Sequence, residues 1–218
     1  QLQSGGGALL SPSVSGIVLP LYSSSGTGAG TGTGGVPQDN ERLLLTAKAN
    51  HKVATWRRQL TRELSPDSIT SIMSALKAAT GYAPGWEKAW HSWAYFNCEA
   101  LAYYNAAGDV EVAQQFVAPA VTGFFRSIEL GQTRNKKTTG HLVRSNNLQD
   151  ILRLLTLWFN YGNAPEVEAA LQEGFGQVSI DTWLSVIPQL LARIHVNIPA
   201  VKRLIHEVLV RVGRQHPQ

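Results

Sequence analysis

The chain has 218 residues, of which 44% are hydrophobic and only 16% are charged, with a formal net charge of +4. A free-standing soluble domain usually carries about 25% charged residues, so a surface this poor in charge suggests contact with other protein. The charge permits polyanion binding but is small for a dedicated nucleic-acid binder. The single cysteine, Cys98, excludes a disulfide within the chain and favours a reducing compartment, so we expect a cytoplasmic protein. No apolar run approaches the roughly 18 residues of a membrane span, so we expect no membrane insertion.

The first 38 residues differ in composition from the rest. They hold ten of the twenty glycines and no Asp, Glu, Lys or Arg. Such a segment buries too little apolar surface to offset the entropy of ordering, so we expect residues 1–38 to be a disordered, low-complexity head rich in Gly, Ser and Thr. Within it, "GTGTGG" has the spacing of a dinucleotide-binding loop, but no strand precedes it and Pro37 follows, which favours a coincidence of composition. Because the chain begins with Gln, we expect it to be part of a longer protein.

From residue 39 onward the apolar residues recur at intervals of three and four, which predicts amphipathic helices almost throughout. We predict about eight helices in four antiparallel pairs: 39–63 with 66–80, 84–107 with 110–130, 147–161 with 164–175, and 180–195 with 198–213. Each pair has the length of one helical-hairpin repeat. The predicted fold is therefore all-α, with antiparallel hairpins in a TPR/HEAT-like α-solenoid over residues 39–218.

Several residues mark where these helices begin or bend. Ser65, followed by a proline, has the pattern of an N-cap, and Asn163 with Glu166 has the spacing of a capping box. Pro119 and Pro188 lie inside predicted helices, where each removes a backbone donor. We expect a break or bend at both prolines.

Three tryptophans, Trp86, Trp90 and Trp93, are spaced four and three residues apart and therefore share one helix face. Such a stripe fits a buried seam between helices, a ligand cage or a stacking platform for single-stranded nucleic acid. A stacking platform also needs interleaved basic residues, and Lys88 is the only one in this stretch. The favoured interpretation is the buried seam.

Five long blocks occur in a characteristic order: "GWEKAWHSWAYFNCEALAYY", "VAPAVTGFFRSIEL", "NNLQDILRLLTLWFNYG", "IDTWLSVIPQLLARIHV" and "RLIHEVLVRVGRQHPQ". Together they resemble the C-terminal part of the FAT domain of the target-of-rapamycin (TOR) serine/threonine protein kinases, which are phosphatidylinositol 3-kinase-related kinases. The similarity covers about residues 43–218, with a gap at 131–146.

This resemblance implies a non-catalytic scaffold that clamps and regulates a kinase domain in nutrient and growth signalling. It also implies contacts with upstream helical repeats of the same polypeptide and with TOR complex subunits. The whole kinase is expected to use ATP and Mg²⁺, and to occur at lysosomal or vacuolar membranes and in the nucleus as well as in the cytoplasm. The sequence holds no Asp-Phe-Gly motif or catalytic loop, so we do not expect this segment to transfer phosphate itself.

Lys48 and Lys52 lie one helical turn apart, and Lys88 lies near the start of the tryptophan-rich helix. By spacing alone they indicate a solvated helix face. The resemblance instead implies an inositol hexakisphosphate pocket lined by basic residues, of which these three would form a part. Lys48 would stand where relatives carry an Arg, which keeps the charge but loses a bidentate contact.

The segment 131–146 is basic, with Arg134, Lys136, Lys137 and Arg144, and it departs from the family pattern. A flexible solvated loop is the favoured interpretation, and contact with an acidic partner or RNA is the alternative.

Other reactive side chains carry little signal. The six histidines show no metal-ligand spacing, and we expect His91 to be packed and hydrogen-bonded rather than catalytic. Cys98 has no basic neighbours that would activate it, and Arg126 has the place to bridge two helices through a carboxylate. A second hypothesis for the whole chain is a stand-alone helical-repeat adaptor that binds peptide or RNA. An enzyme in its own right is the weakest hypothesis.

Overall fold

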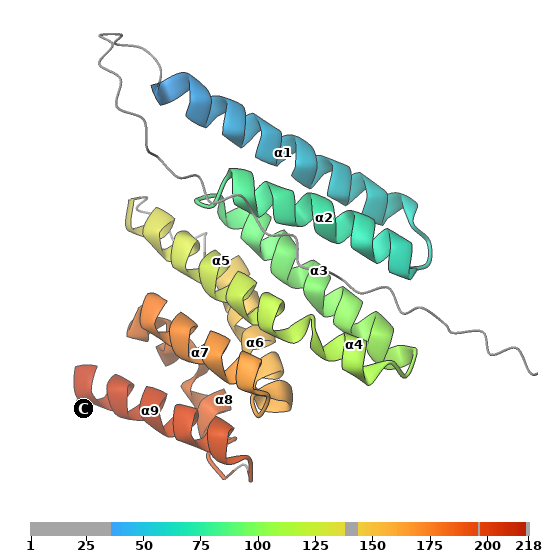
Figure 1. Ribbon diagram of the computed structural model, residues 1–218. Coiled ribbons are helices and arrows are strands. Elements are labelled where there is room, and N and C mark those ends of the chain that lie inside the picture. The colour runs from blue at the N-terminus through green and yellow to red at the C-terminus, as the bar shows by residue number, and fades with distance from the viewer. Residues whose placement is uncertain (1–35, 138–143, 196, 217–218) are drawn as a thin grey trace, which may run out of the picture. The chain divides into compact units, whose positions relative to one another are not determined.

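The computed structural model describes the backbone of residues 36–137, 144–195 and 197–216, and their side chains except at 36–38, 134–137 and 144–147. All of these residues belong to the unit Val36–Gln218. They form helices and, within these ranges, no strand (Figure 1), which confirms the all-α prediction. The predicted head lies outside the described residues except at 36–38, which already belong to the first helix.

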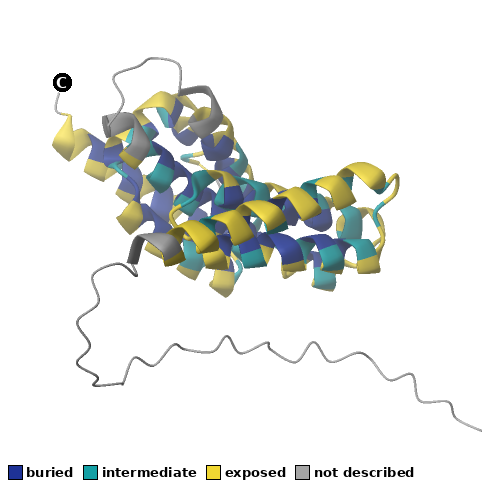
Figure 2. Ribbon diagram, turned by 90° about the horizontal axis from the view of Figure 1, so that it is seen from above, coloured by how far each residue is buried: buried dark blue, intermediate teal, exposed yellow. Residues whose placement is uncertain are grey.

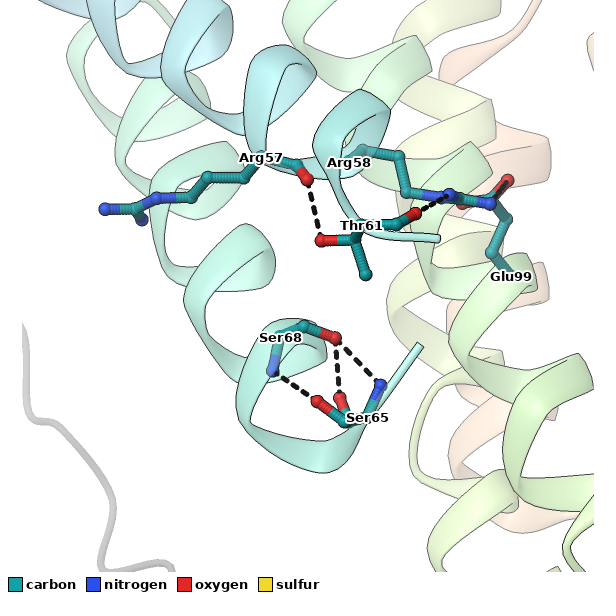
Figure 3. Close-up of polar contacts among 6 residues, drawn as sticks. All are labelled: Arg57, Arg58, Thr61, Ser65, Ser68 and Glu99. Carbon is teal, nitrogen blue, oxygen red and sulfur yellow. Dashed lines mark hydrogen bonds and ion pairs between the residues drawn. The ribbon is translucent and has the colours of Figure 1, made fainter. Parts of the chain in front are cut away.

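The first hairpin consists of α1 (Val36–Leu60) and α2 (Pro66–Tyr82), which lie side by side (Figure 1). The start of α2 is a capping box: the Ser68 amide donates to Ser65 Oγ at 3.3 Å, and the Ser65 amide donates to Ser68 Oγ at 2.8 Å (Figure 3). The two bonds satisfy backbone donors that the first helical turn leaves without partners. The N-cap predicted at Ser65 is confirmed.

Next come α3 (Glu87–Ala106), α4 (Val110–Gln114) and α5 (Val117–Lys137). The turn after α3 uses Gly108 at φ 82°, a conformation that glycine adopts without steric cost. The helix predicted for 110–130 is divided in two, and Pro119 falls in the first turn of α5. A proline is tolerated there because the amide it lacks would have had no partner within the helix.

The remaining elements are α6 (Arg144–Tyr161), α7 (Pro165–Gln177), the 3₁₀ helix η2 (Ile180–Val186), α8 (Ile187–Leu191) and α9 (Pro199–Gln215). The prediction of a single helix over 180–195 is therefore wrong, because this range is divided between η2 and α8. A new helix begins beside Pro188, which occupies the second position of α8, as expected of a residue that cannot continue a preceding helix. The capping box predicted at Asn163 is also wrong, because Pro165 starts α7 and makes Ala164 the N-cap residue, which has no side-chain acceptor.

The basic loop predicted for 131–146 is shorter than expected, because α5 continues to Lys137 and α6 begins at Arg144. Contacts with η2 hold this end of α5. The Gln132 amide group donates to Thr182 Oγ1 and accepts a hydrogen bond from the Ser179 backbone at 3.3 Å. Residues 138–143 lie outside the described residues.

Among the residues whose side chains are described, two clusters of buried side chains form the core, and Figure 2 shows the buried faces of the helices turned toward one another. The smaller cluster joins α1, α2 and α3 and consists of Ala54, Ile69, Ile72, Ala75, Leu76, Phe96 and Ala100. The larger cluster extends from α3 to α9, and its largest members are Phe124, Phe125, Trp158, Phe175 and Trp183.

The three tryptophans of the α3 region are half-buried. Trp93 packs against the smaller core cluster, so the predicted seam is confirmed at Trp93, but none of the three rings is fully buried. The fully buried residues of α3 include three small ones, Ala89, Ala94 and Ala100, together with Phe96 and Leu101. Helix α5 comes so close that a Cβ atom added at Gly123 would lie 2.9 Å from the Ala94 Cβ. Only small side chains fit between the two backbones at this point, and the Trp93 indole packs beside them, with its Cδ1 3.0 Å from the same Cβ position.

Candidate functional site

The contact between α1 and α3 has a fixed register. His51 Nε2 lies 2.8 Å from Ser92 Oγ, and one heptad further on Arg58 Nε donates to Glu99 Oε2 at 2.8 Å (Figure 3). Both pairs are 41 residues apart in sequence, so the two helices run in the same direction with a constant offset. The same offset places Lys88 level with the start of the Lys48–Lys52 turn of α1.

The three predicted ligand-binding lysines come to one end of this contact. Lys88 lies one turn before Ser92 on the face of α3 that meets α1, because residues four apart share a helix face. On α1, a rotation of about 100° per residue puts Lys48 between His51 and Lys52 on the same flank. All three lysines are exposed, and the Lys52 ammonium lies 5.2 Å from the centre of the Trp56 ring. The arrangement presents three positive charges from two helices.

His51 lies beneath these lysines, and sequence reasoning missed it. It is only 8% exposed, and its ring centre lies 5.2 Å from that of Trp86. Burial lowers the pKa of His51, and the positive charges of Lys88 and Lys52 lower it further. Two lysines from different helices therefore act on one imidazole. In the sequence, the only local sign that His51 lies beside this charge cluster is its position between Lys48 and Lys52.

A second polar junction lies where α3, α5 and α6 meet. Asp150 is 1% exposed, and its carboxylate accepts hydrogen bonds from Ser127 Oγ at 2.8 Å and from His91 Nδ1 at 2.9 Å. The hydrogen bond with Asp150 raises the pKa of His91. The serine donates to the carboxylate and not to the imidazole, so this junction lacks the serine–histidine hydrogen bond of a catalytic triad. The junction links α3, α5 and α6, and the prediction of a hydrogen-bonded His91 is confirmed.

Two further side chains were singled out in the sequence. Arg126 donates to Glu129 on its own helix at 2.6 Å, and its guanidinium lies 5.8 Å from the centre of the Trp90 ring. It therefore reaches α3 through an aromatic ring, and the predicted bridge through a carboxylate is wrong. Burial raises the pKa of Cys98 to about 11, so its thiol is protonated and unreactive at neutral pH.

Within the described ranges, no group of three or more His, Cys, Asp or Glu side chains could hold a metal ion. None of the helices described there is long and apolar enough to cross a membrane. The candidate site is therefore the group of Lys48, His51, Lys52 and Lys88.

The family model of the FAT domain matches residues 37–156, which is more than half of the chain. The chain therefore belongs to the FAT domain family. Its relatives place it more narrowly. The serine/threonine-protein kinase TOR of Oryza sativa subsp. japonica is 44% identical over 202 residues, an alignment that covers 93% of this chain and 8% of the relative. The serine/threonine-protein kinase TOR of Arabidopsis thaliana is 47% identical over 183 residues, covering 84% and 7%. The serine/threonine-protein kinase mTor of Drosophila melanogaster is 39% identical over 201 residues, covering 83% and 8%.

The chain thus spans less than a tenth of the length of these curated relatives. It is a FAT segment of the TOR type, and the FAT domain is a non-catalytic, helical scaffold region of such kinases.

Proposed function

We propose that this chain forms part of a TOR-type serine/threonine protein kinase, in which it clamps the kinase domain and regulates it in response to nutrient and growth signals. The kinase domain of the same polypeptide would bind ATP and Mg²⁺. Upstream helical repeats and subunits of a TOR complex would be its protein partners. The similarity to kinases along nearly the whole chain supports this proposal.

The structural observation that carries the proposal is an apolar stripe on the outer face of α1. Its members are Leu45, Val53, Trp56 and Leu60, with exposed fractions of 58%, 38%, 54% and 84%. At about 100° per residue they fall within an arc of roughly 80°. Helical repeats bury such faces against the neighbouring repeat. Since the relatives are more than ten times longer than this chain, we infer that another repeat of the same polypeptide covers the stripe.

The test is a pair of substitutions, Leu45→Asp with Trp56→Asp, in the intact kinase. Charges on a buried face would loosen the array, so the expected result is a lower melting temperature and weaker kinase activity, with catalytic residues untouched. Val110→Asp is the matched control, because Val110 is 53% exposed and begins the short helix α4. Unchanged stability and activity of the double variant would contradict the proposal. Tight binding of a peptide or RNA by this segment alone would favour the adaptor hypothesis.

We also propose that Lys48, Lys52 and Lys88 supply part of an inositol hexakisphosphate site. Three ammonium groups from two helices suit a compact ligand with many phosphates, since each contact is charge-assisted. Lys52 and Lys88 both lie near enough to His51 to oppose its protonation, which supports their placement around one site. Further basic residues would come from a neighbouring repeat.

This site is tested in the intact kinase by Lys52→Glu with Lys88→Glu. Each reversal should weaken inositol hexakisphosphate binding about tenfold or more, measured by calorimetry. Lys202→Glu, an exposed lysine on α9, is the control and should bind as the wild type does. Equal affinity of all three proteins would rule the site out.

A further inference from the structure

We propose that His51 couples polyphosphate binding at the lysine site to the uptake of one proton, so that each ligand strengthens the binding of the other. This inference rests on the proposed anion site and adds a means of regulating it. The ligand class is a compact polyphosphate, and the proton is taken up by an imidazole that lies beneath the lysines.

The geometry around His51 suits a group that changes its protonation state without losing its place. The Nε2 atom lies 2.8 Å from Ser92 Oγ, and the Trp86 ring covers the imidazole at 5.2 Å between centres. A serine hydroxyl can donate to a neutral imidazole nitrogen or accept from a protonated one. The link between α1 and α3 is therefore retained in both states.

The charges around His51 explain why a ligand would change its protonation. Lys52 acts on it from its own helix, and Lys88 and His91 act on it from α3, all of them opposing a proton. Glu87, in the same turn as Lys88, acts on His91. Within the described residues α2 adds no charge to this set. Without ligand, the field at His51 is therefore positive.

A polyphosphate bound across Lys52 and Lys88 would reverse that field. Its negative charges would lie above the lysines. Because His51 is only 8% exposed, its interaction with these charges would be weakly screened. The pKa of His51 would rise from its lowered value. Because coupling between two ligands is reciprocal, a proton on His51 must strengthen polyphosphate binding by the same factor.

The expected behaviour follows from this linkage. Affinity should rise as the pH falls through the interval between the pKa of His51 in the free protein and that in the complex. For one proton the gain cannot exceed about tenfold per pH unit. Outside this interval the contribution of His51 should be flat.

The experiment measures inositol hexakisphosphate binding to the intact kinase by calorimetry, at one pH in two buffers that differ in heat of ionisation. The ligand itself also titrates, so the informative quantity is the difference in proton uptake between the wild type and His51→Gln. Glutamine can keep a hydrogen bond to Ser92 but takes up no proton. The wild type should take up a measurable additional fraction of a proton, and its affinity should rise several-fold more between pH 8 and pH 6. His206→Gln, an exposed histidine on α9, is the matched control and should behave as the wild type does.

The possible outcomes distinguish the proposed proton coupling at His51 from the proposed anion site at the lysines. Binding with equal proton uptake by the wild type and His51→Gln overturns the proton coupling and leaves the anion site intact. No binding by the wild type overturns both. Thermal unfolding checks that His51→Gln is folded, and His51→Asn serves as the second substitution if it is not.

Discussion

The region of α1, α2 and α3 and the region of α5 to α9 are held together in different ways. The first has a small core of alanines and a few larger apolar residues, and α1 meets α3 through the polar pairs His51–Ser92 and Arg58–Glu99. The second is built around five large aromatic side chains, with ring centres 4.8–6.4 Å apart for the packed pairs of Phe125, Trp158, Phe175 and Trp183. The polar contact of α1 with α3 depends on charge and protonation, whereas the aromatic core of the second region depends on shape. The candidate site lies in the region whose contacts can respond to a ligand.

The largest expected effect comes from removing a ring of the aromatic region. Trp183 is 1% exposed, so Trp183→Ala should lower the free energy of unfolding by about 3–5 kcal/mol through lost burial and a residual cavity. Trp56, which is 54% exposed on α1, is the matched residue of the first region, and Trp56→Ala should cost less than about 1 kcal/mol in the isolated chain. Urea unfolding measures both values. Equal losses would show that the two regions do not differ in this way.

Two glycines on α7 test how closely the aromatic region is packed. A Cβ atom at Gly174 would lie 2.1 Å from Phe125 Cδ2, whereas one at Gly176 would meet nothing within 4 Å. Gly174→Ala should therefore destabilise the chain by about 1–3 kcal/mol through overpacking. Gly176→Ala should stabilise it, by up to about 1 kcal/mol, because alanine favours the helix. Changes of the same sign in the melting temperatures would argue against close packing at Phe125.

The comparison of the two regions also shows which features can be predicted from the sequence. Periodic apolar residues predicted the helices, and Ser65 was found from its position before a proline, because both signals are local. The burial of the α3 tryptophans was overestimated, since periodicity marks a face but not how deeply each of its side chains is buried. The contact of His91 with Asp150 joins residues 59 apart in sequence and leaves no local pattern. The placement of Lys88 at the same end of the α1–α3 contact as Lys48 and Lys52 was expected only through the family resemblance.

The contributions of His51 on α1 and His91 on α3 to the free energy of unfolding should change with pH in opposite directions. The pKa of His91 is raised by its hydrogen bond to Asp150, so its stabilising contribution is complete below pH 6.5 and is lost as the pH rises through the folded-state value. The pKa of His51 is lowered by burial, so it destabilises the fold as the pH falls below 6.5.

Unfolding free energies of the wild type, His91→Gln and His51→Gln, measured from pH 5 to pH 9, check these signs. The wild type should lose stability relative to His91→Gln at high pH, and relative to His51→Gln at low pH. For His91 the effect should stay below about 1 kcal/mol, because 39% of its side chain is exposed and solvent screens the pair. A change of the same sign for both histidines would mean that the two junctions are not electrostatically distinct.

The smallest effect is expected at the pair of Arg58 and Glu99, whose side chains are 39% and 23% exposed. A double-mutant cycle with Arg58→Ala, Glu99→Ala and both together should give a coupling of about 0.5 kcal/mol that shrinks as salt is added. A coupling above about 2 kcal/mol, independent of salt, would mean that this bridge alone fixes α1 on α3. A small coupling has the more interesting consequence. A ligand with many negative charges, bound across Lys52 and Lys88 at the other end of the same contact, would then contribute more to holding α1 against α3 than the native ion pair does.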